Sequence, residues 1–233
     1  ECLGMALDIW NTVQVELGPF GIKIIGEGHD VLGLGRSNLV YRGVKLALEQ
    51  SGREAAEVSI KSDNDIVLSR GLGSSAAAMV GGLVAGNEIC GRPLSDSDLL
   101  SLAAQEEGHP DNVVPALLGG CRIVVKDRGR FITSQVSVPD DLQVVVFIPD
   151  VPISTSKARS LLSREIDRQD AVYNIGRVAL LINAFASGDY DHLSVATQDR
   201  LHQPARQRLF PPMKVIFDAA MGAGALGVFL SGS

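Results

Sequence analysis

The segment Arg70–Ala77 brings together residue types that bind phosphate, in the order Arg-Gly-Leu-Gly-Ser-Ser-Ala-Ala. Glycine lets the backbone adopt positive φ and come close to a ligand. The small residues of Met79–Cys90 favour a helix, so the two serines fall where that helix begins and one of them is placed to cap it. The first N–H groups of a helix have no acceptor within it, and beside glycines they bind anions, most often phosphate. The alternative is an ordinary glycine turn followed by a serine cap.

Two common phosphate-binding motifs are excluded. A Walker-type loop needs a lysine after its last glycine, and none follows here. The run Gly222–Gly227 spells the dinucleotide pattern, but it follows an expected helix, Lys214–Met221, and precedes an expected strand, Val228–Leu230. Because a Rossmann turn joins a strand to a helix in the opposite order, this match is accidental.

The segment around Gly71 and Gly73 resembles the second motif of the GHMP kinases, Pro-x-x-x-Gly-Leu-Gly-Ser-Ser-Ala, with Val67 where proline is usual. Two further runs, Glu107–Val113 and Leu201–Arg206, are similar to the homoserine kinases of that family. The resemblance extends in order over essentially the whole chain. It also implies that both ends are cut, because the family's first motif and most of its third would be missing.

The resemblance implies an α+β fold with two domains. Residues 1–138 would form the ATP-binding domain, similar to domain 2 of ribosomal protein S5, and residues 139–233 a ferredoxin-like domain. The boundary is placed near Pro139–Asp141, where the character of the sequence changes. The implied reaction is transfer of the γ-phosphoryl group of ATP to the side-chain hydroxyl of L-homoserine, with Mg²⁺, in threonine biosynthesis. The alternatives are another GHMP kinase with a mevalonate- or sugar-type acceptor, and a non-catalytic relative that binds nucleotide.

The implied nucleotide site combines the glycine-rich loop with Asn38. Asn38 lies in a run similar to the family's adenine-contacting segment, although it equally fits the first turn of a helix. The loop residues assigned to ATP are Val67, Leu68, Ser69, Arg70, Gly71, Leu72, Gly73, Ser74, Ser75, Ala76 and Ala77.

By the resemblance, magnesium is held by the hydroxyl of Ser75 and the carboxylate of Glu107, with Ser74 and Glu106 as the alternatives. One hydroxyl and one carboxylate suit Mg²⁺, which prefers hard oxygens and few protein ligands. The other interpretation of the glutamates is a solvated helix end. Acidic residues oppose the helix dipole there, which favours a functional reason.

The loop His109–Asn112 is assigned to the acceptor by the resemblance, through His109, Asp111 and Asn112. Asp111 would meet the substrate ammonium, and Asn112 would lie near the reacting hydroxyl. The structural alternative is that Asp111 or Asn112 caps a helix over Val113–Leu117. Homoserine kinases are thought to lack a positioned general base, and Asp111 as a base stays an alternative.

Thr155, Arg159 and Arg206 complete the implied acceptor site. The planar fork of arginine binds both oxygens of a carboxylate, so two arginines suit an amino-acid substrate. The residues expected to act in catalysis are Asn112, Asp111 and Arg159. A surface salt bridge is the ordinary role of an isolated arginine.

Periodicity and capping residues place these candidates on elements. Expected strands are Ile9–Leu17, a partner strand with Ile22 and Ile24, and the segments Val58–Ile60, Ile123–Val125 and Gln143–Ile148. Expected helices are Asn38–Gln50 capped by Ser37, one capped by Ser95 that ends near Glu107, one over Asp170–Ala186 and one from Pro211 to Gly222. The inner face of the third of these helices would carry Val172, Ile175, Ala179 and Ile182.

Composition limits the partners of the chain. With 233 residues, 45% hydrophobic, the chain can bury one or two cores. The net charge of −6 without a Lys/Arg block excludes nucleic acid and anionic membranes, and 5% aromatic residues argue against base stacking. No apolar run reaches transmembrane length. Three separated cysteines are typical of a reducing compartment, so we expect a cytoplasmic enzyme, with a homodimer as one expected state.

Overall fold

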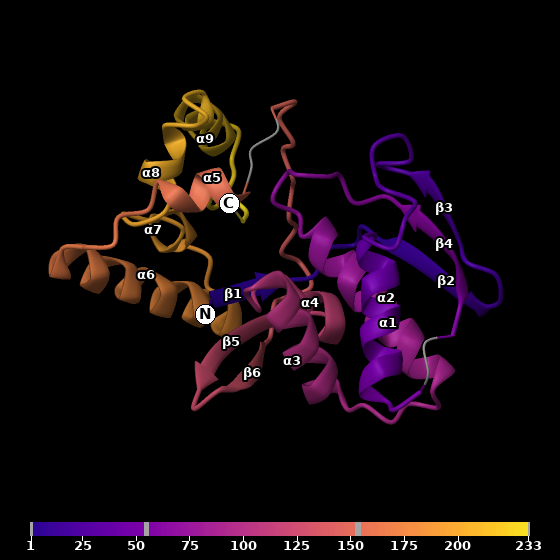
Figure 1. The fold of residues 1–233 in the computed structure, drawn as a ribbon. Helices are drawn as coiled ribbons and strands as arrows, with labels where there is room; N and C mark the ends of the chain where they lie inside the picture. The colour runs from indigo at the N-terminus through magenta and orange to yellow at the C-terminus, as the bar shows by residue number, and fades with distance from the viewer. Residues whose placement is uncertain (1, 54–55, 152–154, 233) are drawn as a thin grey trace. The chain divides into compact units, whose positions relative to one another are not determined.

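The computed structural model describes residues 2–53, 56–151 and 155–232 (Figure 1). The chain divides into two compact units: Glu1–Leu68 with Leu72–Gln135, and Ser69–Gly71 with Val136–Ser233. Among the described residues, the first unit contains both sheets and four helices, and the second contains helices and irregular segments. This confirms the predicted α+β class, while the domain boundary after residue 138 stays a prediction.

One sheet of the first unit has the strand order β1-β5-β6, with β1 (Cys2–Met5), β5 (Cys121–Asp127) and β6 (Arg130–Val136). β1 pairs antiparallel with β5, so that Met5 lies opposite Cys121. The segment Ile123–Val125 was predicted to be a strand and lies within β5. β1 was not predicted, because four residues are too few to show an alternating pattern.

The second sheet has the order β2-β4-β3, with β2 (Asn11–Leu17), β3 (Gly21–Gly26) and β4 (Val58–Asn64). The predicted pairing of β2 with β3 is therefore wrong, since β4 lies between them, antiparallel to β2 and parallel to β3. The loop joining β2 to β3 passes Glu57, whose backbone oxygen accepts from the Gly18 N–H and whose carboxylate accepts from the Phe20 N–H. Strands that are adjacent in the sequence usually pair, and here a later strand with four buried residues takes the central position.

The helices of the first unit are α1 (Leu39–Gln50), α2 (Ser74–Ile89), α3 (Asp96–Glu107) and α4 (Val113–Leu118). α1 and α2 lie side by side (Figure 1) and approach closely because glycines line their contact. A Cβ added at Gly82 would lie 2.2 Å from the backbone oxygen of Val40. A core of buried side chains joins α2, α3, α4 and β5, and it includes Met79, Leu83, Leu100, Val114 and Val124.

Two of the predicted caps are wrong and one is confirmed. Asn38, not Ser37, caps α1, because its side chain accepts from the Val40 N–H. α2 has Gly73 as its N-cap with no side-chain cap, so neither of the serines that follow caps this helix. Ser95 and Asp98 form the predicted capping box of α3.

The second unit contains α5 (Thr155–Ser160), α6 (Arg168–Ser187), α7 (Leu193–Ala196), α8 (Gln203–Gln207) and α9 (Met213–Gly222). The predicted strands over residues 143–148 and 228–230 are wrong, since these residues have no regular structure. Within the first of these segments, Val145 is 90% exposed and Phe147 is 66% exposed. No described residue from 137 to 232 forms a strand, so the ferredoxin-like arrangement stays a prediction.

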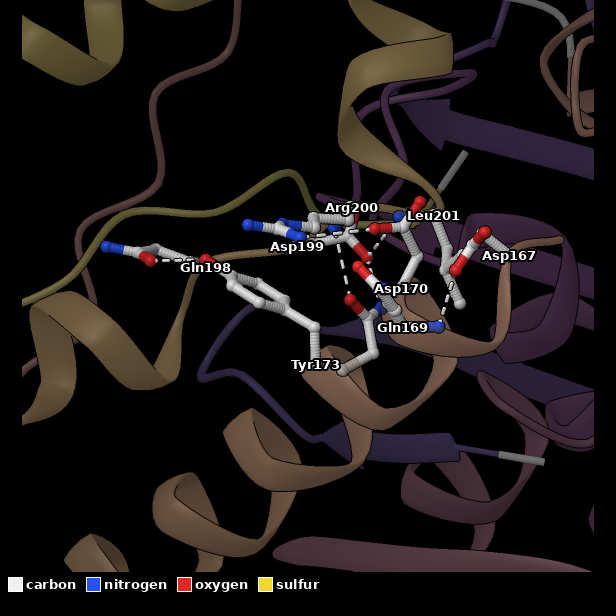
Figure 2. A network of polar contacts seen from close by, with 9 residues as sticks. Asp167, Gln169, Asp170, Tyr173, Gln198, Asp199, Arg200 and Leu201 are labelled. Atoms are coloured by element: carbon white, nitrogen blue, oxygen red, sulfur yellow. Dashed lines mark hydrogen bonds and ion pairs between the residues drawn. The ribbon is translucent and has the colours of Figure 1, made fainter.

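α6 confirms a predicted helix but turns a different face inward. Val172 and Ile175, which were predicted to be buried, are 62% and 68% exposed, and Ala179 is exposed as well. Ile182 is half-buried. The Tyr173 hydroxyl instead donates to Gln198 in the segment before α8 (Figure 2). The Asn174 side chain bonds to Asp199 of the same segment. An apolar stripe is buried only where another element covers it, and periodicity alone does not say whether one does.

Candidate functional site

The glycine-rich loop has the backbone that its sequence requires. Gly71 and Gly73 adopt φ of +72° and +73°, and Ser69 is also in the left-handed region at 56°. Gly73 immediately precedes α2, so the first N–H groups of that helix have no acceptor within it. A glycine turn that leads into a helix N-terminus is an anion-binding geometry.

Contacts on either side hold this loop in place. The Leu68 N–H donates to the Glu27 carboxylate at 3.2 Å. Arg70 forms an ion pair of 3.3 Å with Asp150. A Cβ added at Gly71 would lie 2.3 Å from the backbone oxygen of Ser231, whose hydroxyl donates to the Gly71 oxygen at 3.0 Å. Only glycine fits at position 71, because both its φ and its neighbour exclude a side chain.

Ser75 and Glu107 come together although 32 residues separate them. The Ser75 hydroxyl donates to a Glu107 carboxylate oxygen at 2.5 Å, at the first turn of α2 and the last residue of α3. Glu106, the neighbouring carboxylate, is instead paired with Arg42 of α1. Two oxygen atoms of the kind that bind hard cations therefore lie together beside the glycine-rich loop. The charge of the other glutamate, Glu106, is already neutralised by Arg42.

The loop His109–Asn112 lies against the start of α2. Gly108 ends α3 in the left-handed conformation. The Asp111 carboxylate then accepts from the Asn112 N–H at 3.0 Å and contacts Nδ1 of His109. A Cβ added at Gly73 would lie 3.1 Å from Cβ of Asn112, so the Asn112 side chain packs against the phosphate loop. Asn112 precedes α4 but makes no side-chain cap, which removes the capping interpretation for that residue.

The candidates of the second unit lie on two short helices. Thr155 begins α5, and its side chain lies outside the described residues; Arg159 is on the same helix. Arg206 is on α8 and donates from Nη1 to the Gly232 oxygen at 3.0 Å. Because the neighbouring Ser231 bonds to Gly71, Arg206 is linked within the second unit to Gly71.

Asn38 already uses both polar atoms of its side chain. Its oxygen accepts from the Val40 N–H and its nitrogen donates to the Gly33 oxygen, each at 3.0 Å. In this conformation Asn38 is a helix cap, and its contact with a base stays a prediction.

Among the described residues, those predicted to form the site lie in two separate groups. Glu107, Ser75, Asn112 and Gly73 converge in the first unit, while Gly71 and Arg206 are linked in the second. The sequence interpretation missed Arg42, because an arginine within a helix gives no sign of its partner 64 residues away. Among the described residues, no group of three His, Cys, Asp or Glu side chains is arranged to hold a metal ion, and no helix is long and apolar enough to cross a membrane.

Comparison with known proteins gives consistent matches. A family model described as the GHMP kinases N terminal domain matches residues 38–120. The homoserine kinase of Caldicellulosiruptor saccharolyticus is 41% identical over 100% of this chain and 76% of its own length. That of Moorella thermoacetica is 42% identical over 100% of this chain and 79% of its own length.

Comparison with solved structures agrees with these sequence matches. The crystal structure of homoserine kinase from Cytophaga hutchinsonii superposes with a TM-score of 0.83 at 29% identity, covering 99% of this chain and 77% of that one. Mevalonate kinase of L. major shares the fold at a TM-score of 0.68 and 16% identity, covering 98% of this chain and 76% of that one. By identity over its full length and by fold, this chain belongs to the homoserine kinase family of the GHMP kinases.

Proposed function

We propose that this protein transfers the γ-phosphoryl group of ATP to the side-chain hydroxyl of L-homoserine and forms O-phospho-L-homoserine, a step in threonine biosynthesis. The observation that carries the proposal is the contact between Ser75 and Glu107 beside the glycines with positive φ. The whole of this chain is also 41% identical to part of a homoserine kinase. Phosphoryl transfer depends mainly on positioning and on neutralising phosphate charge, which the N–H groups of the loop and a metal ion held by Ser75 and Glu107 would supply.

The nucleotide phosphates would lie on the backbone N–H groups of Gly71–Ala77, with the other loop residues from Val67 onward around them. Mg²⁺ would be held by the Ser75 hydroxyl and the Glu107 carboxylate, because the Glu106 carboxylate is occupied by Arg42. When bound, this ion neutralises phosphate charge and orients the γ-phosphoryl group.

The acceptor amino acid would be held by groups of opposite charge at its two ends. Asp111 would bind the ammonium group, with its carboxylate oriented by the Asn112 N–H and His109. Arg206, Arg159 and Thr155 would bind the carboxylate. Asn112, packed against Gly73, would then lie where the substrate hydroxyl approaches the phosphate.

The hydroxyl proton would pass toward the phosphoryl oxygens, which a loose transition state tolerates. Asp111 acting as general base is the alternative. Without a general base, Asp111, Asn112 and Arg159 would act by holding the acceptor so that its hydroxyl lies in line with the phosphoryl group, and such positioning is a large source of rate enhancement.

We also place this enzyme in the cytoplasm. The three cysteines in 233 residues are typical of a reducing compartment, and Cys90 and Cys121 are free. The partners would be small molecules, without nucleic acid or membrane. A homodimer stays a prediction.

The test is a coupled ADP-release assay of the purified protein with MgATP and three acceptors, L-homoserine, mevalonate and galactose. We expect turnover with homoserine only, because a neutral sugar offers no carboxylate to the arginines and mevalonate offers no ammonium to Asp111. Turnover with mevalonate or galactose and none with homoserine would contradict the proposal.

A further inference from the structure

Asp199 lies in the segment between α7 and α8 (Figure 2), and both of its carboxylate oxygens accept hydrogen bonds. One oxygen accepts from the side-chain nitrogen of Asn174 at 2.5 Å and from the Leu201 N–H at 3.1 Å. The other accepts from the N–H groups of His202 at 2.7 Å and Gln203 at 2.5 Å. One carboxylate therefore fixes three consecutive backbone N–H groups, and such charge-assisted bonds are stronger than neutral ones.

These bonds set the direction in which α8 leaves the turn. α8 has only five residues, and a helix of that length has little stability of its own. Its orientation must come from its anchors, which are the Asp199 turn at its start and two bonds of the Gln203 side chain. Gln203 donates to the Thr197 oxygen at 3.1 Å and accepts from the Leu230 N–H at 2.9 Å.

Arg206 is one turn further along α8 and is tied to the same anchors. Its N–H donates to the His202 oxygen, and His202 is itself held by Asp199. Its guanidinium donates to Gly232, two residues after the Leu230 that Gln203 holds. Movement of residues 201–203 would therefore change where the Arg206 guanidinium points.

The long helix α6 provides the fixed base of this arrangement. Asn174 bonds to Asp199 through its nitrogen and accepts the Arg200 N–H through its oxygen at 3.0 Å. The Tyr173 hydroxyl donates to the Gln198 side chain at 2.6 Å, and the Arg200 guanidinium lies 3.9 Å from the centre of the Tyr173 ring (Figure 2). The polar part of the covered face of α6 is thus the part that bonds to this segment, while its buried residues Ala184 and Phe185 are apolar.

We propose that Asp199 is a positioning residue for the acceptor: it fixes the turn at residues 201–203 and thereby aims Arg206 at the substrate carboxylate. This inference rests on the proposed function, which assigns Arg206 to that carboxylate. Asp199 itself touches no substrate, and its effect reaches the reaction only through α8.

The experiment compares two carboxylate-to-amide variants of the full chain. Asp199→Asn keeps the shape but replaces one acceptor oxygen by an NH₂ group that faces backbone N–H groups. We expect the KM for L-homoserine to rise roughly ten-fold or more, from the loss of hydrogen bonds to a charged group. The KM for ATP should stay within about two-fold of wild type, because Asp199 contacts no residue assigned to ATP.

Asp167→Asn is the matched control. Asp167 caps α6 by accepting the Gln169 N–H at 2.6 Å, and it makes no bond to residues 199–203 in the described contacts (Figure 2). Asparagine caps a helix about as well as aspartate, so this variant should keep both KM values of wild type.

A double-mutant cycle with Arg206→Ala separates positioning from a general structural effect. If Asp199 acts through Arg206, adding Asp199→Asn to Arg206→Ala leaves the KM for homoserine unchanged, because coupled residues are not additive. Should Asp199→Asn fail to fold, Asn174→Ala removes one of the four donors and is expected to raise the same KM by a smaller factor.

The inference is overturned if Asp199→Asn, or Asn174→Ala in its place, has the wild-type KM for homoserine. It is also overturned if the KM values for ATP and homoserine rise together, or if the double variant is worse by the full single-variant factor. Absence of homoserine turnover in the wild-type protein is a different result, since it would contradict the proposed function itself.

Discussion

Neighbouring residues of identical type can have separate roles, and Glu106 and Glu107 are an example. Glu107 meets the Ser75 hydroxyl at 2.5 Å, whereas Glu106 pairs with Arg42. Both glutamates end the same helix, and the sequence motif alone left them as alternatives. The difference is set by which side of α3 faces α1 and which faces the start of α2.

We predict that Glu107→Gln lowers kcat about 10²–10³-fold, as expected for the loss of one electrostatic group at a phosphoryl-transfer site. It should also raise the Mg²⁺ concentration that gives half-maximal rate, because an amide is a weaker ligand for a hard cation. Steady-state kinetics over a magnesium titration measures both.

Glu106→Gln is the matched control, with the same chemical change one residue earlier. It breaks a partly exposed ion pair, so its effect on the magnesium requirement should be small. A larger magnesium effect from Glu106→Gln than from Glu107→Gln would reverse the assignment.

Asp199 should also make the stability of the protein depend on pH. Burial raises the pKa of this carboxyl, but the hydrogen bonds from Gln203, Asn174, Leu201 and His202 together outweigh it and hold the pKa below its ordinary value of 3.8. A lowered pKa in the folded state stabilises the protein above the ordinary value, and this contribution is lost as pH falls through the folded-state pKa.

We therefore expect the Tm difference between wild type and Asp199→Asn to be largest near neutral pH and to shrink below about pH 4. Thermal unfolding followed by circular dichroism across that range measures it. A difference that stays constant from neutral to acid pH would show that the charge of Asp199 does not contribute.

At the scale of elements, glycines explain how α2 can begin at the phosphate loop and still pack tightly along α1. Gly82 and Gly43 both face backbone atoms of the opposite helix. A Cβ added at Gly43 would lie 2.6 Å from the Met79 oxygen. The glycines that make α2 a weak helix by propensity are thus the residues that let it pack against α1.

We predict that Gly82→Ala lowers the free energy of unfolding by about 1–3 kcal/mol, because the new methyl group must displace the Val40 backbone. Gly176→Ala on α6 is the matched control: nothing lies within 4 Å of its added Cβ. There alanine should raise the free energy of unfolding by about 0.5–1 kcal/mol through helix propensity. Urea denaturation measures both, and equal effects of the two variants would contradict the proposed packing.

Local signals in the sequence predicted most of the helices. Features that depend on contacts between distant segments were missed. The capping box at Ser95 and Asp98 was found because a cap lies within four residues of its helix. The insertion of β4 between β2 and β3 depends on pairing between segments more than 30 residues apart, which no local pattern contains. The prediction of the buried face of α6 was wrong for the same reason, since the element that packs against a helix decides which of its faces is buried.

At the scale of the whole molecule, each unit holds part of the predicted site. The family resemblance predicted the members of the site, and of these Ser75 and Glu107 are in contact in the structure, while their roles stay predictions. Composition and periodicity did not predict the roles of Arg42 and Asp199, because neither residue belongs to one of the motifs and their contacts with Glu106 and with residues 201–203 depend on the folded structure.

The central claim is that the backbone N–H groups of Gly71–Ala77 hold the phosphates of ATP while an amino acid lies beside them. A crystal structure with Mg²⁺, a non-hydrolysable ATP analogue and L-homoserine tests it most directly. We predict the triphosphate on these N–H groups, the metal on Ser75 and Glu107, and the homoserine carboxylate on Arg206. A nucleotide bound elsewhere, with this loop covered by protein side chains, would contradict it.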